Sequence, residues 1–219
     1  MDQNKNQPGV TLEKFQDVIN RDTPPLLQKI VANLKPILIG AAVLVALAAT
    51  VAGFRMLQAR NLAGAQEALG SILVSTNGKD KIAALEKFLP EAPSALRGAV
   101  LFELAGASMA VEDYAKAVDY WQQLVSVSKG DAKLVASLGH ARALVLAGKP
   151  ADAVKELSAL KPNAPEAFKA PLDRQLGLAA EAAGDRATAL AAYGDLLQSG
   201  EAGDKPYIES KIAQLKAAN

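Results

Sequence analysis

The chain has 219 residues, half of them hydrophobic, which is enough for one domain with a sizeable core and an accessory segment. Aromatic residues make up only 5%, and the abundant alanine favours helices that pack closely, so we expect an all-α protein. The net charge of +1 comes without a basic block, which excludes the positive stripe of a nucleic-acid binder, and the lack of cysteine excludes disulfides, thiolate nucleophiles and sulfur metal ligands.

Three segments precede the most apolar part of the sequence. Residues 1–10 are rich in Asn and Gln, and we expect them to be disordered. Residues 11–20 place apolar side chains at helical spacing and predict a short amphipathic helix. Residues 26–34 again share an apolar face, which fits either a helix lying on a membrane surface or a helix that binds a partner. Both interpretations stay open.

Residues 36–54 form an apolar run of 19 residues without a charge, bounded by Lys35 and Arg55. As a helix the run would be about 28 Å long, close to the roughly 30 Å hydrocarbon core of a bilayer. A buried helix of a soluble domain would show a polar stripe, which this run lacks. A cleaved signal peptide is a second alternative, because residues 46–48 read Ala-Leu-Ala, but the preceding 35 residues are too long for a basic leader. The sequence therefore predicts one transmembrane helix, an uncleaved signal anchor.

The basic residues around this run favour one orientation. Arg21, Lys29 and Lys35 precede it, whereas only Arg55 and Arg60 follow it closely. Because the more basic flank stays in the cytoplasm, we expect a cytoplasmic amino terminus and a translocated carboxyl portion, which in a bacterium is periplasmic.

The sequence beyond the apolar run repeats with a period of 36 residues. Each copy has a turn pair, then an alanine four residues on, a bulky apolar residue four further and a leucine three beyond that. The turn pairs are Glu112-Asp113, Gly148-Lys149 and Gly184-Asp185, followed by Ala117, Ala153 and Ala189, by Trp121, Leu157 and Tyr193, and by Leu124, Leu160 and Leu196. Positions four and three apart lie on one helical face, where a small residue lets a neighbouring helix approach and a large one fills the space beside it. Each helix pair leaves an apolar face uncovered, so the pairs must stack.

This pattern resembles the tetratricopeptide repeat. Residues 101–124 form the best copy, with Leu104-Ala105 at the position of the family's Leu-Gly, and Leu176-Gly177 serves the third copy. The middle copy departs from the pattern with His140 at the leucine position. The signature tryptophans of the first helices are replaced by Leu101, Ser137 and Asp173, so the repeats are degenerate.

Further helices are expected on both sides of the three copies. Residues 60–76 and 79–89 predict a capping helix pair, in which Ala84 and Phe88 are the small and large partners. A final helix over 205–218 follows an Asp204 cap, and its apolar face consists of Tyr207, Ile208, Ile212 and Leu215.

The predicted fold class is thus all-α, with one N-terminal transmembrane helix followed by an α-solenoid of degenerate tetratricopeptide-like helix pairs and a C-terminal capping helix. The predicted domains are a cytoplasmic tail over residues 1–35, the transmembrane helix over 36–54 and the repeat domain over 55–219.

This arrangement resembles the bacterial family of ancillary Sec translocon subunits, whose repeat domain is shared with a cell-division coordinator. The resemblance implies a single-pass protein of the bacterial inner membrane with a periplasmic repeat domain. It also implies protein partners, which would be translocon subunits, periplasmic chaperones or translocating substrate chains. The alternative is a structural assembly or coordination factor for cell-envelope or cell-division complexes.

No catalytic constellation is found in the sequence. His140 falls at a core-facing position, has no recognised acid or nucleophile partner nearby, and cannot form a zinc site alone. Gly70, Gly78 and Gly98 lack the spacing of a phosphate-binding loop. Glu112 and Asp113 form an acidic pair in the turn of the first copy, and helix capping explains this pair. We therefore expect that the chain is not an enzyme. We also expect it to bind no cofactor, metal or small-molecule substrate.

A repeat stack offers a concave surface made by the first helix of each pair. By analogy with the family, the groove candidates are Phe102, Gly106 and Met109, then Leu138, Arg142 and Val145, then Arg174, Leu178 and Glu181. Apolar contact and charge-assisted bonds there could hold an extended or helical peptide. The alternative is ordinary interhelix packing for the aliphatic members and solvated surface for the charged ones.

Overall fold

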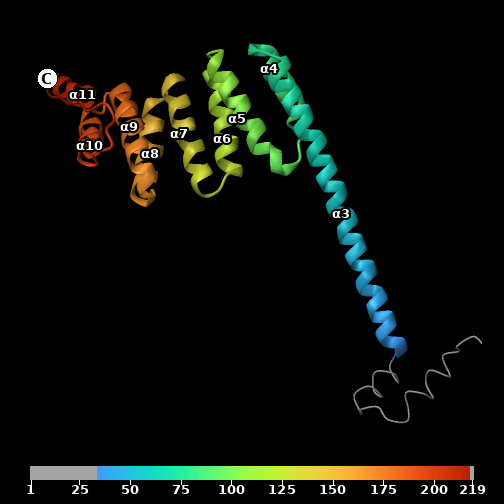
Figure 1. Ribbon diagram of the computed structural model, residues 1–219. Coiled ribbons are helices and arrows are strands. Elements are labelled where there is room, and N and C mark those ends of the chain that lie inside the picture. Colours follow the sequence, from blue (N-terminus) through green and yellow to red (C-terminus); the bar gives the residue numbers. More distant parts are fainter. Residues whose placement is uncertain (1–33, 218–219) are drawn as a thin grey trace, which may run out of the picture. The chain divides into compact units, whose positions relative to one another are not determined.

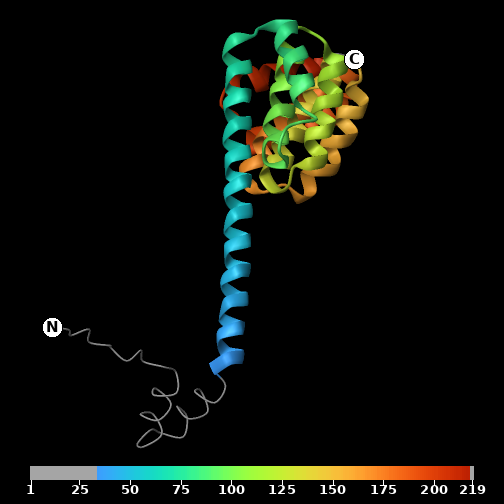
Figure 2. The ribbon, with the colours of Figure 1, turned by 90° about the vertical axis from the view of Figure 1, so that its right-hand side faces the viewer.

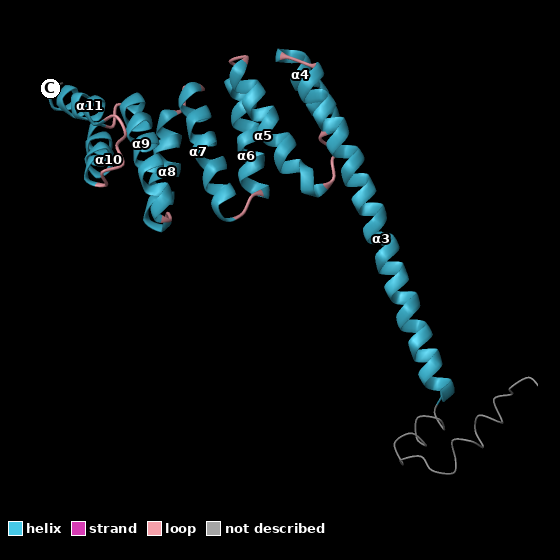
Figure 3. Cartoon of the chain, viewed as in Figure 1, coloured by secondary structure: helices cyan, strands magenta, loops and turns pink. Residues whose placement is uncertain are grey.

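The computed structural model of the chain describes residues 34–217. In this part every regular element is a helix, as the cartoon in Figure 3 shows, so the predicted all-α class is confirmed. The chain divides into two compact units, residues 1–60 and 61–219. The segments predicted within residues 1–33 lie outside the described residues.

Helix α3, Leu34–Ser75, begins in the first unit. Its large apolar side chains between residues 38 and 54 point outward on all sides, and each is more than half exposed: Leu38, Ile39, Val43, Leu44, Val45, Leu47, Val51 and Phe54. Among the described residues, α3 is the one helix long and apolar enough to cross a membrane, and none of its most apolar window is buried within the chain. The length and apolar surface of this helix are consistent with a single membrane span.

The helix does not end with the apolar run. The sequence predicts a new helix at Arg60, but this prediction is wrong, because α3 continues without a break to Ser75. Residues 55–59 read Arg-Met-Leu-Gln-Ala, which are all good helix formers. Without a glycine or proline at this point, nothing stops the helix.

The helices of the second unit follow one another in a row in chain order (Figure 1). Seen along this row, the helix pairs lie behind one another (Figure 2), and helices adjacent in sequence pack together. The second unit is therefore the predicted α-solenoid. The helix bounds are Gly78–Phe88 for α4, Ser94–Ala110 for α5, Tyr114–Val127 for α6, Gly130–Leu146 for α7, Pro150–Leu160 for α8, Glu166–Ala183 for α9, Arg186–Gln198 for α10 and Lys205–Ala217 for α11, with a short 3₁₀ helix η1, Lys161–Asn163, after α8.

The turns inside the three helix pairs share one geometry, which explains the recurring turn pairs of the sequence. Glu112, Gly148 and Gly184 have positive φ angles of 61°, 76° and 73°. The N–H of the next residue then donates to a carbonyl of the first helix and closes that helix. These bonds run from Asp113 to Ser108 at 2.9 Å, from Lys149 to Leu144 at 2.8 Å and from Asp185 to Ala180 at 2.8 Å.

Two of the second helices begin with an aspartate that acts as a cap. The Asp113 carboxylate accepts the backbone N–H of Lys116 at 3.2 Å, and the Asp185 carboxylate accepts that of Thr188 at 3.1 Å. The hydrogen bonds from Thr188 hold the pKa of Asp185 below its usual value. The middle pair has Lys149 at this position and uses Pro150 in the first helical turn instead.

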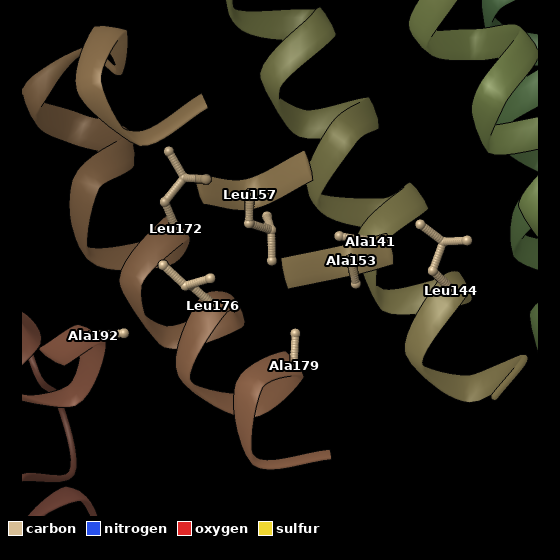
Figure 4. Close-up of a cluster of buried hydrophobic side chains, with 8 residues drawn as sticks. All are labelled: Ala141, Leu144, Ala153, Leu157, Leu172, Leu176, Ala179 and Ala192. Atoms are coloured by element: carbon tan, nitrogen blue, oxygen red, sulfur yellow. The ribbon is translucent and has the colours of Figure 1, made fainter. Parts of the chain in front are cut away.

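The alanines of the second helices set the packing distance. Ala117, Ala153 and Ala189 are completely buried. Figure 4 shows the middle cluster, in which Ala153 and Leu157 of α8 lie among side chains of α7 and α9. The members of this cluster are Ala141, Leu144, Ala153, Leu157, Leu172, Leu176, Ala179 and Ala192. The small side chain admits the neighbouring helix, and the leucine fills the remaining space.

The positions of the missing signature tryptophans remain core positions. Leu101, Ser137 and Asp173 are all buried. The Asp173 carboxylate lies 2.6 Å from the Lys161 ammonium, which supplies the partner that a buried charge requires. The degenerate repeats therefore keep the packing geometry with smaller or paired side chains.

The stack begins with a capping pair made of residues 61–75 of α3 and helix α4. Its buried face carries Ile82 and Leu85 of α4, packed with Leu69 of α3. Of the predicted small and large partners, Ala84 and Phe88, both are partly buried, and Phe88 packs against this cluster.

Helix α11 ends the stack, as predicted. Ile208 is completely buried and packs with Tyr193 and Leu196 of α10. The backbone N–H of Tyr207 donates to the Asp204 carboxylate at 3.3 Å, which confirms the cap. The Tyr207 side chain, expected on the apolar face, is 44% exposed.

Candidate functional site

The repeat period places equivalent residues on one face of α5, α7 and α9, the first helices of the three pairs. Phe102, Leu138 and Arg174 are equivalent, and four residues further on lie Gly106, Arg142 and Leu178. Residues four apart share a helical face, so each first helix turns the same face to one side of the stack. Hollows in the surface follow this face.

The largest of these hollows has a volume of about 770 Å³. Helices α5 and α7 contribute most of its lining, α6 adds two aromatic side chains, and α9 adds one residue. Its lining is mostly apolar and contains no acidic residue: Gly106, Met109, Ala110, Tyr114, Trp121, Leu138, Gly139, Arg142, Leu146 and Gln175. We name it the central hollow.

Two further hollows adjoin the central one. A hollow of about 220 Å³ between α4 and α5 shares Gly106 and Ala110 with it. Another, of about 450 Å³ between α7 and α9, shares Leu138 and Gln175 with it. Because neighbouring hollows share wall residues, they form one depression across the three first helices. We call this depression the repeat groove.

Trp121 sets the depth of the central hollow. The residue is 8% exposed, and its ring meets the Phe102 ring edge to face, with centroids 5.5 Å apart and planes at 89°. On its other side it presses against the backbone of α7, where a Cβ on Gly139 would lie 2.6 Å from the ring. The lack of a side chain at Gly139 therefore makes room for the indole between α5 and α7.

Six of the nine sequence candidates line the repeat groove: Phe102, Gly106, Met109, Leu138, Arg142 and Arg174. The other three lie outside these hollows. Val145 packs against the middle core cluster, and Leu178 is 38% exposed. Glu181 accepts hydrogen bonds from the Tyr193 hydroxyl at 2.5 Å and from the Lys211 ammonium at 3.0 Å, which ties it to the end of the stack.

The two arginines of the groove have different surroundings. Arg174 donates a hydrogen bond to the backbone carbonyl of Ala202 in the loop before α11. Arg142 is exposed at the central hollow and forms no ion pair or hydrogen bond with another residue of the described part of the chain. The groove therefore presents one uncommitted guanidinium on a mostly apolar surface.

Several lining residues were not predicted. Trp121 belongs to the second-helix signature, which predicts interhelix packing, and the same side chain also lines the hollow. Leu146 lies four residues after Arg142, so its place on the same face could have been read from the spacing. Tyr114 and Gln175 carry no such signal, because their positions depend on how neighbouring pairs pack.

His140 is buried in the core, as predicted, and it has an acidic partner 16 residues further along the chain. Its Nδ1 lies 2.7 Å from a carboxylate oxygen of Glu156 on α8. The pair joins the two helices of one repeat and contains no nucleophile. Within residues 34–217, no group of three or more His, Asp or Glu side chains is arranged to hold a metal ion.

The chain matches the sequence model of one protein family, described as tetratricopeptide repeat-like domain, over residues 31–217. No curated protein matches it.

Two solved structures have a similar fold. Both contain nearly identical TPR-like repeats assigned to a kinesin light chain of Podosopora anserina. One is 20% identical in sequence, with a TM-score of 0.54 over 66% of this chain and 77% of that one. The other, a single-substitution variant of the same protein, is 21% identical, with a TM-score of 0.50 over 72% of this chain and 77% of that one. At this level of identity the likeness concerns the fold alone.

Proposed function

This chain belongs to the family of tetratricopeptide repeat-like domains, and we propose that it is a protein-binding scaffold held at a membrane by helix α3. Repeats of this type generally mediate protein–protein interactions and are typically not enzymes. The observation that carries the proposal is the repeat groove, a continuous and largely apolar depression across α5, α7 and α9. A groove of this kind can hold a peptide segment along several repeats at once.

The membrane tether rests on the surface of α3. Its apolar side chains between residues 38 and 54 have no cover within the chain. We place the membrane segment at residues 36–54, with a cytoplasmic tail over 1–35 and the repeat domain over 55–219 in the periplasm of a bacterium. The charge bias around the segment supports this orientation.

The finer assignment is an ancillary factor of the Sec translocon that contacts periplasmic chaperones or translocating chains. Its support is the order of a tail, one apolar helix and a stack of degenerate repeats. The family match covers the apolar helix and the repeats together, so this order extends over the matched region. The alternative is a coordination factor for envelope or division complexes.

Crosslinking in intact cells, followed by mass spectrometry, tests the assignment. A photo-reactive residue replaces Met109 in the central hollow, and the matched control carries it at Lys155, an exposed position of α8 outside the groove. We expect translocon subunits or periplasmic chaperones to crosslink at the groove position only. Wall synthases or division proteins in their place would support the alternative. Identical products at both positions would contradict binding in the groove.

A separate experiment tests the orientation. A reporter that is active only outside the cytoplasm is fused after Asn219. We expect activity, because the carboxyl portion follows the membrane segment on its far side. An inactive fusion of a stable protein would reverse the proposed topology.

A further inference from the structure

The central hollow combines apolar walls with one uncommitted cation. Met109, Leu138 and Leu146 supply apolar surface, and Gly106 leaves open space where a side chain would stand, since no atom lies within 4 Å of a Cβ built there. Arg142 is the only charged residue of the lining. A side chain bound here would therefore have its apolar part covered and a guanidinium beside it.

The neighbouring cations of the groove are already engaged. Lys81, in the hollow between α4 and α5, forms an ion pair with Glu103 at 2.7 Å, and Arg174 is bonded to the Ala202 carbonyl. Arg142 has no such partner among residues 34–217. A guanidinium beside apolar surface binds a carboxylate through charge-assisted hydrogen bonds, which are stronger than neutral ones. Charge complementarity thus points to an acidic group on the ligand.

The position of the central hollow indicates where on the ligand this acid lies. The groove continues past the central hollow on both sides, because the flanking hollows share its walls. A peptide that fills the groove therefore runs through this point, which favours an acidic side chain over a terminal carboxylate.

We propose that the repeat groove binds an extended peptide segment of its partner by taking one large apolar side chain into the central hollow and pairing Arg142 with an Asp or Glu side chain beside it. This inference rests on the proposed function and names the class of ligand. The apolar anchor supplies buried area, and the acid determines which segments bind.

Selection from a random peptide library tests the proposal. Peptides displayed with their carboxyl ends fused to a carrier, so that no terminal carboxylate is free, are selected on the purified full-length chain in mild detergent. The variants are Arg142→Glu, which reverses the charge, and Gly106→Phe, which fills the hollow. Gly70→Phe is the matched control, because Gly70 is an exposed helical glycine outside the groove that also has open space around it.

We expect the unchanged protein to enrich peptides in which Asp or Glu stands within two residues of a large apolar residue. Synthetic copies should bind Arg142→Glu about tenfold or more weakly, as for the loss of a charged hydrogen bond. Selection on Arg142→Glu should enrich Lys or Arg at the acidic position. Gly106→Phe should abolish binding, and Gly70→Phe should retain it.

Other results separate the two proposals. If binding is lost in Gly106→Phe but selected peptides show no acidic preference, or keep it on Arg142→Glu, the inference about the ligand is wrong and the groove stands. Synthetic peptides that bind only through a free terminal carboxylate would also overturn it. If Gly106→Phe binds every selected peptide as well as the control does, or no peptide is enriched, binding in the groove itself is refuted.

Discussion

Two glycines of the first helices show how differently the same residue type is used. Gly177 of α9 faces the ring of Tyr193, and a Cβ built on it would overlap that ring. Tyr193 is completely buried, and its hydroxyl is bonded to Glu181, so the ring cannot move aside. Gly106 of α5, by contrast, has open space around it. One glycine is required by packing, and the other leaves room in the groove.

These surroundings predict opposite effects of alanine. Gly177→Ala should lower the free energy of unfolding by about 1–3 kcal/mol through overpacking. Gly106→Ala should be neutral or raise it by up to about 1 kcal/mol, because alanine is the better helix former. Denaturant unfolding of the full-length chain in mild detergent measures both. Equal midpoints for the two variants would contradict the contact between Gly177 and Tyr193.

The turn residue Glu112 has a backbone conformation for which the two equivalent turns use glycine. Its φ of 61° matches those of Gly148 and Gly184, but a side chain is strained in this region. Glu112→Gly should raise the free energy of unfolding by about 1 kcal/mol. The reciprocal change, Gly148→Glu, should lower it by a similar amount. Shifts of the thermal midpoint in the same direction for both variants would show that backbone conformation does not decide the effect.

At the scale of elements, α11 depends on side chains of α9 and α10. The Lys211 ammonium lies 3.0 Å from Glu181, and both side chains are mostly buried. The Arg186 guanidinium donates to the carbonyl of Lys216 at 2.8 Å. The cap is therefore held by polar bonds around a small apolar contact centred on Ile208.

Removing one of these bonds should loosen the cap. Lys211→Met should speed hydrogen exchange of the α11 amides, since loss of the ion pair leaves Glu181 without one of its two donors. The matched control is Lys205→Met on the same helix, because Lys205 lies 3.6 Å from Glu209 and both side chains are well exposed. We expect the control to exchange as the unchanged chain does. Equal exchange in the two variants would exclude the Lys211 bond as a support of the cap.

At the scale of the whole molecule, the buried Tyr193 and the partly buried Tyr120 make the fold sensitive to alkali. Burial and a hydrogen bond to Glu181 raise the pKa of Tyr193 far above its ordinary value of 10.0. Burial and a hydrogen bond to Glu86 do the same for the pKa of Tyr120. The unfolded chain releases these protons near pH 10, whereas the folded chain keeps them. The stability that they contribute is therefore complete below that pH and is lost as the pH rises above it.

The denaturant concentration at the unfolding midpoint should accordingly decrease as the pH is raised from about 9 to about 11. This interval brackets the ordinary tyrosine pKa of about 10, at which the unfolded chain loses its protons. The double variant Tyr120→Phe with Tyr193→Phe should show a shallower fall over the same interval. Measurements at pH 7 provide the baseline for each protein, since both tyrosines are neutral there in the folded and unfolded states. An equally steep fall in the variant would assign the alkaline sensitivity to other groups.

The sequence by itself determined the class of the protein and the order of its elements. The sequence contains an uncharged run of 19 residues and turn pairs repeated every 36 residues. Both features act on neighbouring residues, where they determine which segments are helical and where each helix ends. The positive φ of Gly184 ends one helix, and the Asp185 carboxylate caps the start of the next. Ala117 predicts close packing between two helices, because a small side chain permits it whichever helix is the neighbour.

The tertiary structure alone decided the site. Nothing in the sequence distinguishes Arg142 from Arg174, yet a carbonyl from the distant loop before α11 occupies one guanidinium and leaves the other uncommitted. The central hollow exists because Trp121 lies against Gly139 of the next repeat, a contact between two elements. Local periodicity reports which face of a helix is buried, but the space left between helices depends on how side chains from several of them meet.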